Sequence, residues 1–210
     1  QVVHPQEWPE DLDYAGKRVV VIGSGATAIT LLPAMADDTT HITMLQRSPG
    51  YIATLPSKDT VADLLRRVLP AQTAHSLVRW KNVTVSQGFY QFCRRAPKAA
   101  TRLLQAGVRR QVGDAIDIDP HFTPAYRPWD QRLCMVPDGD LFEKLTSGKA
   151  SIVTDRIVTI TPTGIELASG RHIEADIIVT ATGLEMLAIG GISLSVDGMD
   201  VDVANELVYK

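Results

Sequence analysis

The chain has 210 residues, of which 45% are hydrophobic and 21% charged, and its formal net charge is −3. This composition supports a buried core and argues against disorder, and the slightly acidic balance gives no reason to expect nucleic acid or an anionic surface as a partner. Two distant cysteines, Cys93 and Cys134, lack CxxC spacing, which argues against a disulfide scaffold, a cysteine zinc site or a dithiol redox centre.

Residues 1–16 are rich in proline and acidic side chains, and we expect them to form an inter-domain linker arm. The chain starts without methionine and ends directly after an apolar segment, so we expect a piece of a longer protein. No apolar run is long enough to span a bilayer and no signal peptide opens the chain. A cytoplasmic location is the default expectation, with membrane association of the longer protein left open.

A βαβ unit is predicted directly after this arm. The β-branched run 19–22 is typical of a parallel strand that is buried on both faces. Residues 29–38 are expected to be helical, with Pro33 in the first turns or at a kink, and the alternating segment 41–46 is a second strand. The fold class is therefore α/β, a Rossmann-like three-layer dinucleotide-binding domain.

The remaining segments complete a domain assignment. Residues 57–113 have helical periodicity and are expected to be an insertion, followed by an ordered loop at 114–140 and a short helix at 141–145. Short strands are expected at 151–153, 157–161, 164–167, 172–173 and 176–182. Residues 17–56 and 114–185 are then expected to form the nucleotide-binding domain, and 186–210 to lead out of it.

The loop after the first buried strand has the spacing Gly23-x-Gly25-x-x-Ala28. The first glycine permits a tight turn, the second lets a pyrophosphate approach the backbone, and the small alanine lets helix and strand pack closely. The helix N-terminus offers free N–H groups to the phosphates. Ser24, Ala26 and Thr27 are therefore also cofactor-binding candidates; the alternative is a structural tight turn without a ligand.

The end of the second strand predicts which dinucleotide binds. A site for NAD or FAD usually has a carboxylate here for the ribose 2′-hydroxyl, whereas this chain has Gln46, Arg47 and Ser48. Arg47 can pair with a 2′-phosphate, and Ser48 can donate another hydrogen bond. The sequence therefore favours NADP(H), and the alternative is that Arg47 is an exposed strand-end arginine.

Four elements in order resemble the Baeyer–Villiger and flavin-containing monooxygenase family. They are the segment His4-x-x-x-Trp8-Pro9, which is similar to the second half of the signature FxGxxxHxxxWP, the glycine loop, Arg47, and Ala181-Thr182-Gly183. The stretches that resemble the subgroup with the mycobacterial ethionamide-activating monooxygenase are 4–6, 22–28, 46–49 and 128–134.

This resemblance implies a flavoprotein that uses NADPH, FAD and O2 to oxygenate a small ketone or a thioether or thioamide. It implies that Arg132 is the active-site arginine, whose fixed charge would stabilise an anionic peroxide. The alternative is a loop arginine paired with Asp130 or Asp138. Gln131 occupies a place where many relatives have a lysine for the 2′-phosphate, so selectivity would depend more on Arg47.

The resemblance also gives His4 a role in domain movement or active-site organisation, with a linker histidine bonded to a backbone carbonyl as the alternative. The other histidines show no metal-ligand spacing, so no metal is expected. A glycine loop for FAD is absent, so the resemblance implies that residues 186–210 begin a return to a missing FAD domain. We therefore expect the chain to bind dinucleotide and to lack catalytic activity by itself. Two further hypotheses remain, an N- or S-oxygenating flavin monooxygenase and a non-catalytic NADP-sensing or interaction module.

Overall fold

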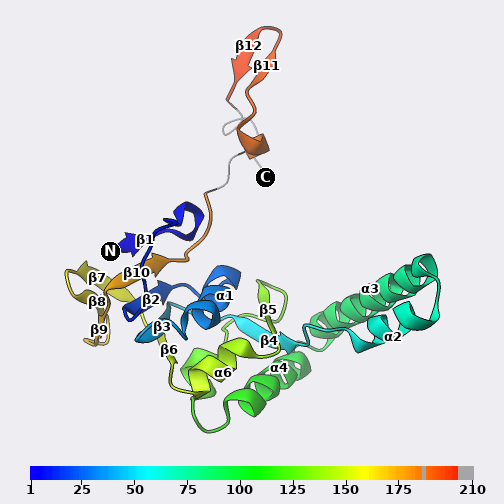
Figure 1. Ribbon diagram of the computed structural model, residues 1–210, viewed down its shortest axis with the longest axis horizontal. Coiled ribbons are helices and arrows are strands. Elements are labelled where there is room, and N and C mark those ends of the chain that lie inside the picture. Colours follow the sequence, from blue (N-terminus) through cyan, green and yellow to red (C-terminus); the bar gives the residue numbers. More distant parts are fainter. Residues whose placement is uncertain (186–187, 203–210) are drawn as a thin grey trace.

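The computed structural model describes residues 1–185 and 188–202. Its centre is a parallel sheet of five strands in the order β1-β10-β2-β3-β6. The strands are β1 (Val2–Val3), β2 (Arg18–Ile22), β3 (His41–Gln46), β6 (Ala150–Thr154) and β10 (Ile177–Thr180). The predicted strands at 19–22 and 41–46 therefore lie side by side at the middle of the sheet (Figure 1).

At the start of the segment expected to be a linker arm, Val2 and Val3 pair with Ile178 and Val179 of β10. Val3 is 4% exposed and belongs to the main core. After a short 3₁₀ turn at Pro5–Glu7, residues up to Lys17 run without regular structure to β2. The start of the chain is thus an edge strand of the sheet.

Helices cover one face of this sheet. Helix α1 (Ala26–Met35) follows β2 directly, and α6 (Asp140–Thr146) packs beside it. Helix α1 begins three residues before the expected start at Ile29, and Pro33 lies in its interior, so of the two expected placements the first turns are excluded. The proline is buried, so its apolar ring packs in the core while its missing N–H removes one helical hydrogen bond.

A small antiparallel sheet covers the other face. It consists of β7 (Ile157–Thr161), β8 (Gly164–Leu167) and β9 (His172–Glu174). Ile165 of β8 and Ile173 of β9 form a core cluster with Val20 of β2, whereas Val19 and Val21 face the helical side. Both faces of β2 are covered, which explains why the strand is continuously apolar over residues 19–22. The third layer is therefore an antiparallel sheet.

The predicted insertion is helical throughout and consists of α2 (Thr60–Val68), α3 (Ala71–Arg95) and α4 (Pro97–Val112). Figure 1 shows α2 and α3 as a hairpin that projects away from the sheet. Helix α4 instead packs against the body of the domain, where Val108 and Val112 join the main core. None of the helices in the described ranges is both long and apolar enough to cross a bilayer.

A two-stranded parallel sheet was not predicted. Strand β4 (Tyr51–Leu55) pairs with β5 (Leu133–Pro137), so part of the segment expected to be a loop at 114–140 is a strand. The rest of that segment is ordered as expected: it contains the single turn α5 (Ile118–His121), and Phe122 is 3% exposed.

The segment 186–210, expected to lead into another domain, lies partly outside the described residues. Its described part contains a short turn at Ala188–Gly191 and a hairpin of β11 (Leu194–Val196) and β12 (Met199–Val201). In Figure 1 this hairpin stands apart from the central sheet.

Candidate functional site

The predicted cofactor residues gather at the carboxyl edge of the central sheet. Strands β2, β3 and β10 are neighbours and parallel, so the glycine loop, the segment after Gln46 and the segment after Thr180 leave the sheet at the same edge. This edge is where ligands bind in open α/β sheets.

Gly23 makes the tight turn at the end of β2. Its φ is +138°, and a Cβ atom at this position would lie 2.3 Å from the carbonyl oxygen of Ala181. Its N–H donates to the carbonyl of Leu45 at 2.8 Å. The turn is therefore wedged between the ends of β3 and β10, and only glycine fits there without moving the backbone.

Gly25 precedes the first turn of α1 and provides no side-chain cap. Ala28, one turn into the helix, is fully buried, as expected for close packing of helix and strand. A Cβ atom on Gly25 would lie 2.5 Å from Nη1 of Arg132. The guanidinium group of Arg132 therefore lies against the surface that the second glycine leaves open at the positive end of the helix dipole.

Arg132 is exposed and lies just before β5. The two carboxylates considered as its alternative partners are engaged elsewhere. Asp130 forms an ion pair with Arg94 at 2.5 Å, and Asp138 accepts a hydrogen bond from the backbone N–H of Ser57 at 3.0 Å. Within the described part of the chain Arg132 has no ion-pair partner.

Tyr126 connects the Arg132 segment to the rest of the domain and was not identified from the sequence. Its hydroxyl donates to the carbonyl of Arg132 at 3.1 Å, and its own carbonyl accepts from the hydroxyl of Tyr51 at 2.8 Å. Burial raises the pKa of Tyr126, so the phenol stays protonated and able to donate. The high density of aromatic residues in 114–140 was the available signal.

Gln46, a predicted cofactor residue, is 2% exposed. Its Nε2 donates to the carbonyl of His121 at 2.8 Å and to Oγ1 of Thr154 at 2.9 Å. Oγ1 of Thr154 also contacts Nδ1 of His121 at 2.8 Å, and burial lowers the pKa of this histidine. The amide of Gln46 therefore holds the ends of β3 and β6 together.

Arg47 and Ser48, the next two residues, are exposed beyond the end of β3. Oγ of Ser24 donates to the carbonyl of Ser48 at 3.2 Å, which joins the glycine loop to this segment. Arg47 makes no ion pair with any residue in the described ranges. Gln131, next to Arg132, is also exposed. Among the described residues, the side chain of Arg47 is therefore a cation without an ion pair at the end of β3.

His4 contacts the third predicted element of the site. Its Nδ1 accepts from the backbone N–H of Gln6 at 3.2 Å, so its Nε2 carries the proton and donates to the carbonyl of Gly183 at 3.1 Å. Ala181 is buried, whereas Thr182 and Gly183 are exposed. The structure thus places His4 at the segment 181–183. Its bond to a backbone carbonyl is the one expected under the alternative, a linker histidine.

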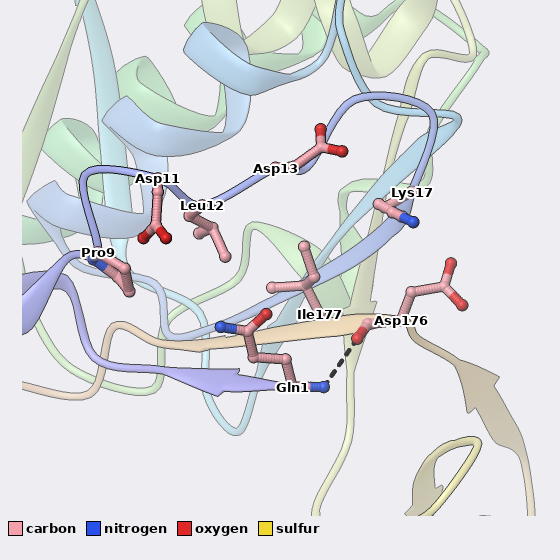
Figure 2. A pocket seen from close by; sticks show the side chains of 8 residues that line it. All are labelled: Gln1, Pro9, Asp11, Leu12, Asp13, Lys17, Asp176 and Ile177. Carbon is pink, nitrogen blue, oxygen red and sulfur yellow. Dashed lines mark hydrogen bonds between the residues drawn. The ribbon is translucent and has the colours of Figure 1, made fainter.

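Other hollows lie elsewhere. A cavity of about 430 Å³ lies at the opposite edge of the sheet, where Lys17 and Asp176 precede β2 and β10. Figure 2 shows the residues that line it. An apolar groove of about 790 Å³ lies between α3, α4 and strands β4 and β5. Across the described residues, no group of three or more His, Cys, Asp or Glu side chains is arranged to hold a metal ion.

No protein-family model matches the chain. Similar curated proteins are the putative FAD-containing monooxygenase MymA of Mycobacterium tuberculosis (54% identical over 99% of this chain and 43% of the relative) and the probable FAD-binding monooxygenase AlmA of Acinetobacter baylyi (52% over 100% and 42%). The FAD-containing monooxygenase EthA of Mycobacterium tuberculosis is 50% identical over 100% of this chain and 43% of its own length. The chain thus spans less than half of the relatives it matches.

Solved structures have the same fold at lower identity. A complex of OTEMO with FAD and NADP has a TM-score of 0.64 at 21% identity, covering 87% of this chain and 42% of its own. An oxidized steroid monooxygenase bound to NADP has a TM-score of 0.62 at 24% identity, covering 88% and 42%. Over its whole length the chain is therefore similar to part of the FAD-containing monooxygenases, and it shares the fold of part of these two solved structures.

Proposed function

We propose that this chain is the NADP(H)-binding domain of an FAD- and NADPH-dependent monooxygenase of the Baeyer–Villiger type. The observation that carries the proposal is the contact of Arg132 with Gly25 at the start of α1. A cationic side chain without a carboxylate partner beside the positive end of a helix is electrostatically unfavourable unless an anion binds there. A dinucleotide pyrophosphate supplies that anion.

The residues of this chain fit NADP(H) at both ends of the phosphate chain. Gly25 leaves room for the pyrophosphate, and the uncapped N–H groups at the start of α1, beside Thr27, would bind its oxygens. Arg47 and Ser48 would bind the 2′-phosphate of the adenosine ribose. Gln46 would not contact the nucleotide, and would instead fix the end of β3, after which Arg47 and Ser48 follow. Gln131 has no charge, so Arg47 would supply most of the selectivity.

In the whole protein, NADPH would supply a hydride to FAD, and O2 would provide the oxygen atom transferred to a ketone, a thioether or a thioamide. The FAD site would lie mostly outside this chain, beyond the segment 181–183, and the FAD-binding remainder would be its partner domain. The resemblance implies a second role for Arg132 besides the pyrophosphate, in which its guanidinium cation would stabilise negative charge that develops on oxygen. His4 would hold the segment 181–183 where the two domains meet. This chain by itself would bind nucleotide without turnover.

Calorimetric titration of the chain with NADP⁺ and NAD⁺, beside the Arg47→Ala variant, tests the proposal. We expect NADP⁺ to bind at least about tenfold more tightly than NAD⁺, a difference of about 1.4 kcal/mol, and the variant to lose this preference. Arg109→Ala, which removes another exposed arginine from α4, is the matched control and should keep it. Equal binding of NAD⁺ would overturn the selectivity, and binding of neither nucleotide would overturn the proposed function.

A further inference from the structure

The hydroxyl of Tyr126 lies beside two segments of the candidate site, the one that carries Arg132 and the one that follows β3. It donates to the carbonyl of Arg132 at 3.1 Å. A Cβ atom on Gly50 would lie 3.5 Å from this hydroxyl and 3.7 Å from the carbonyl oxygen of Ser24. The Arg132 segment and the chain after β3 are therefore both within reach of this phenol group, and the chain after β3 in turn approaches the glycine loop at Gly50.

Tyr126 is itself held by a buried neighbour. The ring of Tyr51 meets it edge-on, with centroids 5.4 Å apart and an interplanar angle of 89°. The hydroxyl of Tyr51 donates to the carbonyl of Tyr126 at 2.8 Å and lies 3.0 Å from Oγ1 of Thr101 on α4. Because Tyr51 is 3% exposed, this anchor belongs to the packed interior of the domain.

The same two tyrosines fix the backbone at Arg132 and at the residue that follows it. Tyr51 pairs in register with Leu133, the residue after Arg132, and Tyr126 binds the carbonyl of Arg132 itself. The Arg132 side chain, by contrast, has no ion pair with a described residue that would hold it. The position of its guanidinium group over Gly25 therefore depends on how its backbone is fixed.

We propose that Tyr126 is a positioning residue for nucleotide binding: its hydroxyl holds the backbone of Arg132 so that the guanidinium group reaches the phosphate site at Gly25. This inference rests on the proposed function and adds to it a residue that acts through Arg132. Removal of the hydroxyl leaves the aromatic packing with Tyr51 intact and frees the Arg132 carbonyl. Arg132 then samples more positions, and phosphate binding costs more conformational entropy.

The test compares Tyr126→Phe, Arg132→Ala and the double variant by calorimetric titration with NADP⁺, with the unfolding temperature of each recorded by scanning calorimetry. A hydrogen bond of this kind predicts roughly three- to tenfold weaker NADP⁺ binding in Tyr126→Phe. In the Arg132→Ala background the same substitution should have no further effect, because the group it positions is gone. Tyr90→Phe, which removes a hydroxyl from a tyrosine packed on Trp129, is the matched control and should bind like wild type.

The outcomes separate the inference from the proposed function. A wild-type chain that does not bind NADP⁺ overturns both. If Arg132→Ala weakens binding but Tyr126→Phe does not, the proposed function stands and the role of Tyr126 is wrong. Equal effects of Tyr126→Phe with and without Arg132, or equal effects of Tyr126→Phe and Tyr90→Phe, show a general structural effect and also overturn the inference.

Discussion

The side-chain amide of Gln6 is hydrogen-bonded twice to the main chain of Glu185. Its Nε2 donates to the carbonyl of Glu185, and its Oε1 accepts from the N–H of the same residue, each at 2.9 Å. With the bond from His4 to Gly183, this pair continues the parallel pairing of β1 and β10 beyond the ends of both strands. Two segments that the resemblance places between domains are thereby joined.

The first prediction concerns this junction. Gln6→Ala removes both hydrogen bonds, so the amide of Glu185 should exchange with solvent faster than in wild type, as measured by hydrogen exchange with NMR detection. Global stability should fall by about 1 kcal/mol or less, because both residues are exposed. Glu7→Ala changes a neighbouring side chain outside the pair and is the control. Unchanged exchange at Glu185 would contradict the assigned bonds.

A second prediction uses Gly25, whose backbone is extended with φ at −87° and tolerates any residue. In Gly25→Ala the new methyl group meets only the flexible end of Arg132 within contact distance. The unfolding temperature should stay close to that of wild type, while NADP⁺ binding is lost because the methyl group blocks the approach of the pyrophosphate. Titration and scanning calorimetry on one sample separate the two effects, and retained affinity would place the phosphates elsewhere.

Gly23 gives the opposite expectation. In Gly23→Ala the methyl group collides with the carbonyl of Ala181, and the alanine must adopt a positive φ. The free energy of unfolding should therefore fall by about 2 kcal/mol or more. Gly148 also has a positive φ but lies in open space, and Gly148→Ala should cost about 1 kcal/mol. Chemical denaturation measures both. Equal losses in the two variants would show that the contact with Ala181 is not tight.

The sequence predicted best those elements whose pattern is local. Strand β2 and the glycine loop are adjacent in the chain, so both their structure and their role could be expected from one short segment. Strand β4 was missed because its partner β5 is far away in sequence and parallel pairing leaves no local signature. The antiparallel outer layer was predicted as short strands, while its place over the sheet depended on tertiary packing.

The site divides in the same way. Arg47 and Arg132 could be proposed from spacing and resemblance, since a charged residue next to a strand end is visible in the sequence. The engagement of Gln46 with His121 and Thr154 could not, because it depends on which strand pairs with β3. Tyr126 was missed for a related reason. It is close in sequence to Arg132, to which it is hydrogen-bonded, but its anchor Tyr51 lies on β4, far away in the sequence.

Acid should remove the contribution of Asp37 to stability. Hydrogen bonds from Lys144, and then from Lys149, lower the pKa of Asp37 to about 2, from 3.8. Because the folded-state value is the lower one, the stabilisation is present above about pH 3.8 and is lost as the pH falls through about 2. Wild type should therefore unfold at higher temperature than Asp37→Asn near neutral pH, and the difference should vanish near pH 2. Asp38→Asn is the control, and a difference that persists in acid would contradict the assignment.

The last prediction tests whether β7, β8 and β9 are an integral layer of the domain. Ile165 of β8 is fully buried and packs in the cluster that contains Val20 and Leu45 of the central sheet. Ile165→Ala should cost about 2 to 5 kcal/mol in the free energy of unfolding, because it opens a cavity between two sheets. Val158→Ala alters the same small sheet at a side chain that is 64% exposed, and should change stability by no more than about 0.5 kcal/mol. Both variants are measured by urea denaturation. A single transition in each would show that the small sheet unfolds together with the central sheet. A negligible loss of unfolding free energy in Ile165→Ala would show that the central sheet is stable without the small one.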